Sequence, residues 1–211
     1  MFVFVGAGSS VATRYLGITE PGSALLISAL ANGLGLAIGI SATLAVSGGV
    51  LNPALAIGLL VGGKLPARDV IPYIVAELVG ATIAAGLLSA VAPYQITNAV
   101  HLGAPTLSGA ISSMQGLIFE LVMTFFLVFA VYGTIVDSRA PKIAGLGVGL
   151  IVIADVLAGG AFTGAAMNPA RAMGPMLAGL FLPSYWYIYW VGPIVGAILA
   201  GIAYRYGLEK A

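Results

Sequence analysis

Two Asn-Pro-Ala tripeptides carry the clearest chemical signal in the chain: Asn52-Pro53-Ala54 and Asn168-Pro169-Ala170. Asparagine is a favoured helix N-cap, and proline is favoured at the first helical position because its missing N–H would have no partner there. We expect each asparagine to cap a helix with its side-chain oxygen and to leave its amide NH2 group free to donate. One such tripeptide is weak evidence, but two copies at equivalent places in two halves of a chain indicate a paired site.

A short apolar stretch follows each tripeptide, at Pro53–Gly63 and Pro169–Leu180. At 1.5 Å per residue each spans roughly 16–18 Å, about half the hydrocarbon thickness of a bilayer. Short interrupted apolar segments at matching places in two halves indicate re-entrant half-helices at a binding or conduction site. Two half-helices with their positive dipole ends at the midplane would donate hydrogen bonds to a passing oxygen and repel cations and hydronium.

The composition predicts an all-α membrane protein. Of the 211 residues 60% are hydrophobic and 7% charged, whereas soluble domains are about 25% charged. A net charge of +1 offers no basic surface for nucleic acid, and a chain with no cysteine and one histidine, His101, lacks the ligands of a metal cluster. With no nucleophile–base pair visible, we expect no catalytic residues, no cofactor and no metal.

Six longer apolar segments supply the rest of the predicted fold. They lie at Phe2–Leu16, Ser23–Ala45, Val70–Val91, Ser112–Val136, Ile143–Gly159 and Ser184–Tyr206. A membrane span needs about 20 residues, so the first segment is short and its start is expected to be truncated. A signal peptide is the alternative for that segment, but it has no basic region in front. We predict one domain over residues 1–211.

The two halves, at about residues 1–100 and 110–211, match in sequence. Phe2–Gly8 resembles Leu127–Gly133, and Ser47–Ala54 resembles Thr163–Ala170. Three spans per half is an odd number, so the second half must be inverted relative to the first. Most basic residues then fall on one side and only Arg14 falls clearly on the other, which predicts that both termini are cytoplasmic. The residues on the basic side are Lys64, Arg68, Arg139, Lys142, Arg205 and Lys210.

In these sequence stretches the chain resembles the aquaporin family of major intrinsic proteins. Within that family, its sequence is most similar to the plant tonoplast intrinsic proteins. Two further similar stretches are Glu120–Thr134 and Tyr189-Trp190-Val191-Gly192-Pro193. The resemblance implies six transmembrane helices plus two re-entrant half-helices in an inverted repeat. It also implies a passive water channel, permeable to small neutral solutes but not to protons or ions, that assembles as a homotetramer in a lipid bilayer.

The resemblance further implies a narrow outer filter made by Asn32, Val156, Ala165 and Arg171, each placed by its spacing from a tripeptide asparagine. An arginine buried in a membrane is costly unless it faces water or carbonyl groups, although an arginine that snorkels outward is the alternative. The other three residues are smaller than the aromatic and histidine of water-strict members. The opening should therefore leave room for ammonia, urea or glycerol, and a facilitator mainly for those solutes is the alternative function.

Four further residues are assigned by the same resemblance or by position. Glu120 lies where family members use a buried glutamate to hold a re-entrant loop. Glu77 stands where the family usually has glutamine, and Asp155 precedes Val156. For both acids a scaffold role, accepting from backbone N–H groups, is favoured over a proton relay. His101 lies in the loop between the third and fourth spans, either as a fifth filter contact or as a solvated histidine.

Small residues recur four positions apart in the apolar segments. This spacing lets helix backbones approach closely, so we predict that these residues lie at helix crossings. The pairs are Gly35 with Gly39, Gly80 with Ala84, Gly145 with Gly149, and Gly192 with Gly196.

Overall fold

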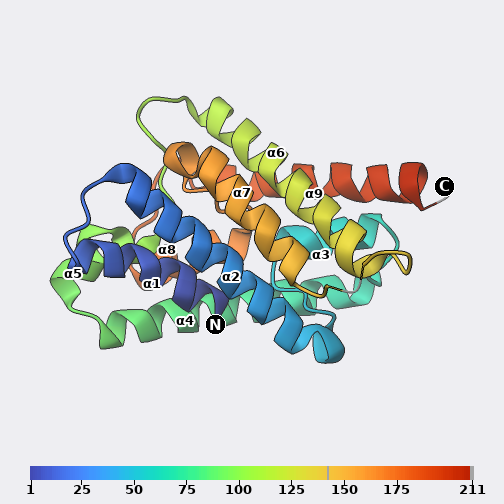
Figure 1. The fold of residues 1–211 in the computed structure, drawn as a ribbon, viewed down its shortest axis with the longest axis horizontal. Coiled ribbons are helices and arrows are strands. Elements are labelled where there is room, and N and C mark those ends of the chain that lie inside the picture. Colours follow the sequence, from blue (N-terminus) through green and yellow to red (C-terminus); the bar gives the residue numbers. More distant parts are fainter. Residues whose placement is uncertain (142, 210–211) are drawn as a thin grey trace.

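The computed structural model describes residues 1–141 and 143–209, and no β-strand occurs among them. The helices form one bundle whose members run roughly along its long axis (Figure 1). They are α1 Phe2–Tyr15, α2 Pro21–Ser47, α3 Pro53–Val61, α4 Ala67–Val91, α5 Tyr94–Ala99, α6 Ser113–Val131, α7 Leu146–Thr163, α8 Pro169–Ala178 and α9 Ile188–Ala203. A 3-10 turn, η1 His101–Gly103, follows α5, and π-helical turns extend α6 (η2 Tyr132–Val136) and α9 (η3 Tyr204–Leu208).

Five helices in the described part of the chain are long and apolar enough to cross a bilayer: α2, α4, α6 with η2, α7, and α9 with η3. The first membrane helix, α1, has 14 residues, or about 21 Å, which is less than the roughly 30 Å of a hydrocarbon core. The half-helices α3 and α8 have 9 and 10 residues. The predicted arrangement of six membrane helices and two half-helices is confirmed.

Helix ends differ from the predicted bounds where the backbone imposes a stop. The second membrane helix begins at Pro21 because Glu20 caps it with its carboxylate. The start of α7 is later than predicted, at Leu146, since Ala144 has a left-handed φ of 48° that interrupts a helix. Its end lies beyond the predicted residue, at Thr163, where Gly164 caps it with φ of 78°. The short helix α5 was not predicted.

Equivalent contacts in the two halves agree with an internal repeat. The Tyr73 hydroxyl donates to Ser47 O at 2.8 Å, and the Tyr189 hydroxyl donates to Thr163 O at 2.8 Å. These residues lie at the same positions relative to the two tripeptide asparagines. In each half, therefore, a tyrosine of a membrane helix holds the end of the helix that precedes the re-entrant loop.

Glycines permit the closest helix crossings. A Cβ added to Gly33 of α2 would lie 2.5 Å from Gly149 O of α7, and one added to Gly149 would lie 2.5 Å from Gly33 O. Likewise, a Cβ at Gly196 of α9 would lie 2.1 Å from Leu121 O of α6. The packing prediction holds at Gly149 and Gly196, whereas Gly33 was not among the predicted residues. It is wrong at Gly80 of α4, where an added Cβ would meet no atom within 4 Å.

Candidate functional site

The predicted caps are present at the N-termini of both half-helices. Asn52 Oδ1 accepts a hydrogen bond from Ala54 N at 2.9 Å, and Asn168 Oδ1 accepts one from Ala170 N at 2.9 Å. A proline follows each asparagine as the first helical residue. Both half-helices therefore begin as the tripeptides predict, and both asparagines line the same small cavity.

The amide nitrogens of the two asparagines bind across the loops. Asn52 Nδ2 donates to Met167 O at 2.9 Å, and Asn168 Nδ2 donates to Leu51 O at 2.9 Å. Each NH2 group has two hydrogens, so one N–H of each asparagine remains for a ligand. The prediction of wholly free amides is wrong, because half of their donor capacity joins the two loops to each other.

The space beside the asparagines is narrow. It is a cavity of about 10 Å³ lined by Asn52, Asn168, Asn32 and Ala165 together with apolar side chains of α1, α2, α6 and α7. A water molecule needs roughly 10–15 Å³ of space measured in this way. The cavity is therefore about the size of one water molecule, and its lining combines amide groups with apolar side chains.

Arg171 lies in the first turn of α8 and is 4% exposed. Its Nη1 donates to Gly103 O at 3.0 Å, and its Nε donates to Asn32 Oδ1 at 3.3 Å. A guanidinium has five N–H donors, so three hydrogens remain beyond these two bonds. Arg171 is held by protein acceptors inside the bundle and does not snorkel outward.

The four residues mapped to an outer filter are divided between two cavities. Asn32 and Ala165 line the narrow cavity. Val156 and Arg171 line a wider cavity of about 520 Å³ that also contacts the loop after η1. All four are at most 5% exposed, and Arg171, which lines the wider cavity, donates to Asn32, which lines the narrow one. The structure thus gathers these residues from α2, α7, the second re-entrant loop and α8.

A buried glutamate holds the second re-entrant loop. Glu120 of α6 has no exposed surface. Its Oε1 accepts from the Thr163 hydroxyl at 2.7 Å and from Ala166 N at 3.0 Å, while its Oε2 accepts from Met167 N at 2.7 Å. Three donors of the loop thereby find partners inside the bundle, where a buried N–H needs one.

The two other predicted scaffold acids differ from each other. Glu77 of α4 accepts from Asn52 N at 2.9 Å through Oε1, which agrees with a scaffold role. Asp155 of α7 is 3% exposed, and within the described residues its Oδ2 has no hydrogen-bond partner. The scaffold expectation for Asp155 is therefore wrong, since no backbone N–H reaches it.

Comparison with known proteins identifies the family. The model of the family described as "Major intrinsic protein" matches residues 1–204. The chain belongs to this family. Among curated relatives, a protein named probable aquaporin TIP3-2 from Arabidopsis thaliana is 41% identical, with 98% of this chain and 79% of the relative covered. Aquaporin TIP4-4 from Zea mays is 43% identical, with 97% and 81% covered.

A solved structure agrees with the fold. The X-ray structure of the aquaglyceroporin from Plasmodium falciparum superposes with a TM-score of 0.88 and covers 99% of this chain and 92% of that one. Its 24% identity supports the fold alone. As a major intrinsic protein, the chain is a multi-pass membrane channel of the aquaporin type and not an enzyme.

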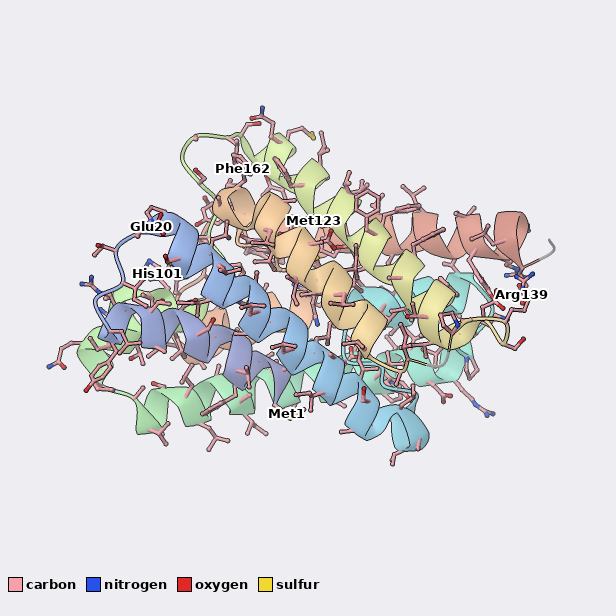
Figure 2. The ribbon with its side chains drawn as sticks, in the orientation of Figure 1. Met1, Glu20, His101, Met123, Arg139 and Phe162 are labelled. Carbon is pink, nitrogen blue, oxygen red and sulfur yellow. The ribbon has the colours of Figure 1, made fainter. Side chains whose placement is uncertain are left out.

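His101 of this major intrinsic protein does not bind Arg171. Its ring stacks on Phe181 with centroids 3.8 Å apart, at the end of the bundle that also carries Glu20 (Figure 2). Arg171 donates instead to the Gly103 carbonyl, two residues further on. Gly103 has φ of 73°, and a Cβ there would lie 2.5 Å from Ala7 O, so only glycine fits.

The sequence did not predict the role of Gly103, nor that of Tyr73 and Tyr189, which hold the ends of α2 and α7 before the re-entrant loops. A backbone carbonyl has no side-chain signature, so Gly103 could be found only as a glycine in a loop rich in turns. Tyr189 lies in a stretch already noted for its resemblance to the family, and its match to Tyr73 at the repeat offset was the available signal.

Proposed function

We propose that this channel conducts water passively in single file, also passes small neutral solutes, and excludes protons and ions. The observation that carries the proposal is the crossed pair of asparagines. Asn52 and Asn168 each keep one N–H beside a cavity the size of one water molecule. A water oxygen passing there accepts from these donors while the apolar wall offers it nothing else.

Ion exclusion rests on two electrostatic features in series. The N-termini of α3 and α8 bring positive dipole ends to the narrow cavity. Arg171 adds a fixed positive charge at the wider cavity. A cation or hydronium must pass both with few acceptors to replace its hydration, whereas a neutral solute meets no such barrier.

The test is stopped-flow light scattering on proteoliposomes that contain the full chain. An outward osmotic gradient is expected to shrink them much faster than protein-free liposomes, and inward gradients of urea or ammonia are expected to give a smaller flux. Glycerol or urea flux without accelerated water flux would reject the water channel in favour of a solute facilitator.

Ala172, fully buried in α8, stands where glycerol facilitators carry aspartate, which supports a channel for water over a facilitator for glycerol.

We propose that the basic end of the bundle is cytoplasmic, with the C-terminus there. Lys64 pairs with Glu209, and Arg205 donates to Val61 O, so both lie where α3 ends near η3. Arg139 lies at that end too, and Glu20 lies at the other (Figure 2). Cytoplasmic loops of membrane proteins carry an excess of such residues. Lys142 and Lys210, which contributed to the sequence prediction, lie outside the described residues.

The N-terminus belongs to the same proposal: α1 starts near the middle of the long axis and runs away from the basic end (Figure 1), which fits entry from the cytoplasm.

We also propose that residues 1–211 form one channel domain, with half-repeats at about 1–100 and 110–211, and that four copies assemble. Exposed apolar side chains on the outer faces of α2, α4 and α6, such as Ile38, Ile83 and Phe126, supply surface for lipid and neighbouring copies. The mass of the detergent-extracted assembly by light scattering tests the tetramer.

A further inference from the structure

The wider cavity beside Arg171 is larger than the passage of water requires. Its volume is about 520 Å³, whereas a water molecule needs roughly 10–15 Å³. It lies at the end of the bundle that carries Glu20 (Figure 2). Pro21, Thr106 and Ala161 line it and are exposed, so a solute reaches it from outside the bundle. A molecule much larger than water can therefore fit here and still be too large for the narrow cavity of about 10 Å³.

The charge in this cavity is positive. Among the described residues that line it, Arg171 is the only charged one, and no salt bridge within residues 1–141 and 143–209 joins it to an acid. Its bonds to Asn32 and Gly103 leave three guanidinium hydrogens unused. Glu120 is a buried acid whose charge acts on Arg171, but the second re-entrant loop binds both of its oxygens. The wider cavity thus offers a buried cation that has donors left for an anion.

A serine hydroxyl lies next to Arg171 in the same wall. Asn32 Nδ2 donates to Ser28 Oγ at 3.3 Å, while Asn32 Oδ1 accepts from Arg171 Nε at 3.3 Å. Ser28 and Arg171 therefore bind the two ends of one carboxamide group, and both line the wider cavity. The hydroxyl hydrogen of Ser28 has no acceptor in the described part of the chain, so it is available to a ligand. Two unused donors, one of them charged, lie about one amide group apart.

Much of the remaining lining is apolar. Leu25 of α2, Val156 of α7 and Pro105 of the loop after η1 contribute to it. Small-molecule sites of roughly 300–1,000 Å³ combine such walls with a few polar groups that fix the orientation of the ligand. The wider cavity fits this description, and the polar groups beside Asn32 are donors.

We propose that the wider cavity binds a small monocarboxylate with a compact apolar body, of which benzoate is an example, and that the bound anion blocks the channel. One carboxylate oxygen accepts from Arg171 Nη2 and the other from Ser28 Oγ. Hydrogen bonds between a guanidinium and a carboxylate are about twice as strong as neutral ones. The ring lies against Leu25 and Val156 and is too large for the narrow cavity. The blocking step rests on the water conduction proposed above.

The lining selects against other ligands of similar size. An ammonium group would bring a second positive charge and three further donors to Arg171. A neutral amide would accept from the same donors but without the attraction between opposite charges. A dicarboxylate would place its second charge against the apolar wall, where the described lining residues provide no second cation. A single carboxylate on an apolar body is the group that satisfies this set.

Two alanines of α7 provide a matched pair of variants. Ala161 and Ala158 are both exposed, but only Ala161 lines the wider cavity. Ala161→Phe therefore fills part of the cavity, whereas Ala158→Phe makes the same change on the same helix and leaves the cavity open. Ser28 provides a second pair, because Ser28→Ala removes the hydroxyl donor and Ser28→Thr keeps it.

The experiment is fluorine NMR of 4-fluorobenzoate with the full chain in nanodiscs at neutral pH, with empty nanodiscs as the blank. We expect the protein to broaden the fluorine line and unlabelled benzoate to reverse the broadening. Benzamide, benzylamine and phthalate should each need at least about tenfold higher concentrations. Ala161→Phe should abolish the broadening and Ala158→Phe should retain it. Ser28→Ala should weaken binding about fivefold, the effect of one net hydrogen bond, whereas Ser28→Thr should not.

Competition by benzamide as strong as that by benzoate overturns the proposal, since it would indicate apolar binding without recognition of the charge. Absence of broadening, or unchanged broadening by Ala161→Phe, overturns it as well. Competition in the unaltered protein tests the charge selectivity even where a variant does not fold.

The blocking step is tested by water flux into or out of proteoliposomes with benzoate on both sides. Benzoate at a concentration that saturates the NMR signal should lower the flux severalfold, and benzamide at that concentration should not. Undiminished flux at saturation overturns the block. The NMR measurement does not depend on conduction. Broadening without accelerated water flux in the parent therefore rejects the water channel and keeps the site, and accelerated flux without broadening does the reverse.

Discussion

The loop before α8 and the loop before α3 present their asparagines in the same geometry, but the bundle holds them unequally. Glu120 binds three donors of the second loop, whereas Glu77 binds one donor of the first. The bond from Asn168 to Leu51 holds the first loop, and the bond from Asn52 to Met167 holds the second loop in the same way. Within residues 1–141 and 143–209, the second loop therefore has more hydrogen bonds to a buried acid than the first.

The largest effect is expected from Glu120→Leu. It leaves three buried donors without a partner, and each costs about 1–3 kcal/mol. The sum is comparable to a typical free energy of unfolding of about 5–15 kcal/mol. We expect little monodisperse protein and no water flux, measured by size-exclusion chromatography and stopped flow. If Glu120→Leu is as stable as Glu77→Leu, the two loops are not anchored unequally.

A smaller loss is expected from Glu77→Leu. One donor, Asn52 N, loses its acceptor, which costs about 1–3 kcal/mol. The protein should fold, melt at a lower temperature and conduct less water, because the first asparagine is less well placed. Glu77→Gln is the control, since its amide oxygen still accepts from Asn52 N, and it should keep most of the flux. Identical melting of the two variants would exclude the anchor role.

Arg171→Val tests the proposal that Arg171, which has no counterpart in the first half, contributes to ion exclusion. The substitution removes the fixed positive charge, while the dipoles of α3 and α8 remain. Water flux should therefore persist, and leakage of protons or small cations should rise severalfold. Leakage is measured with a pH-sensitive dye in proteoliposomes under an imposed potential. A folded, water-conducting variant with unchanged leakage would remove Arg171 from the filter.

Asn32 comes from the first half, whereas Val156, Ala165 and Arg171 come from the second. The double change Asn32→Phe with Val156→His narrows the opening from both halves at once. We expect urea or ammonia flux to fall strongly and water flux only modestly, since water still finds the donors of Arg171. The readout is the ratio of solute to water flux, with each single variant as a control. An unchanged ratio would mean that these positions do not line the constriction.

The smallest effect concerns helix capping. Glu20 caps α2, whereas Gly145 at the equivalent start of α7 has no side chain to cap with. Hydrogen bonds from Ser23, side chain first and then backbone, and from Gly22 lower the pKa of Glu20 below its usual 4.5. Its contribution to stability is therefore complete above that value and is lost as the pH falls through the lower pKa of the folded state.

Between about pH 5 and pH 3, the melting temperature of the parent should drop slightly more than that of Glu20→Gln, as followed by tryptophan fluorescence. A parallel decline of both proteins would show that the cap contributes nothing to the pH dependence.

The sequence determines the fold of this channel more completely than its site. Apolar runs locate the membrane helices, and Asn52-Pro53 and Asn168-Pro169 mark both half-helix starts within one residue. The errors arise where a local backbone state overrides hydropathy, as at Ala144. The π-helical turns that carry α6 and α9 to their ends have no sequence pattern of their own.

At the site, side-chain types predicted the caps and the buried Arg171, but not their partners. Half of the donors of Asn52 and Asn168 go to backbone carbonyls of Met167 and Leu51, and Arg171 binds the carbonyl of Gly103. Any residue can offer such an acceptor, so only the three-dimensional structure selects one. Asp155 shows the converse, because its type suggested partners that the packing does not provide.

The bond from Asn52 to Met167 joins residues 115 positions apart in the chain. A ribosome adds about 5–20 residues per second, so Asn52 emerges roughly 6–23 s before the carbonyl that receives its amide. During that interval the first re-entrant loop must wait in the membrane or the insertion machinery without its counterpart, although hydrocarbon tolerates no unpaired loop. Biosynthesis therefore completes the contact between the two re-entrant loops only after α7 has been made, late in the synthesis of the chain.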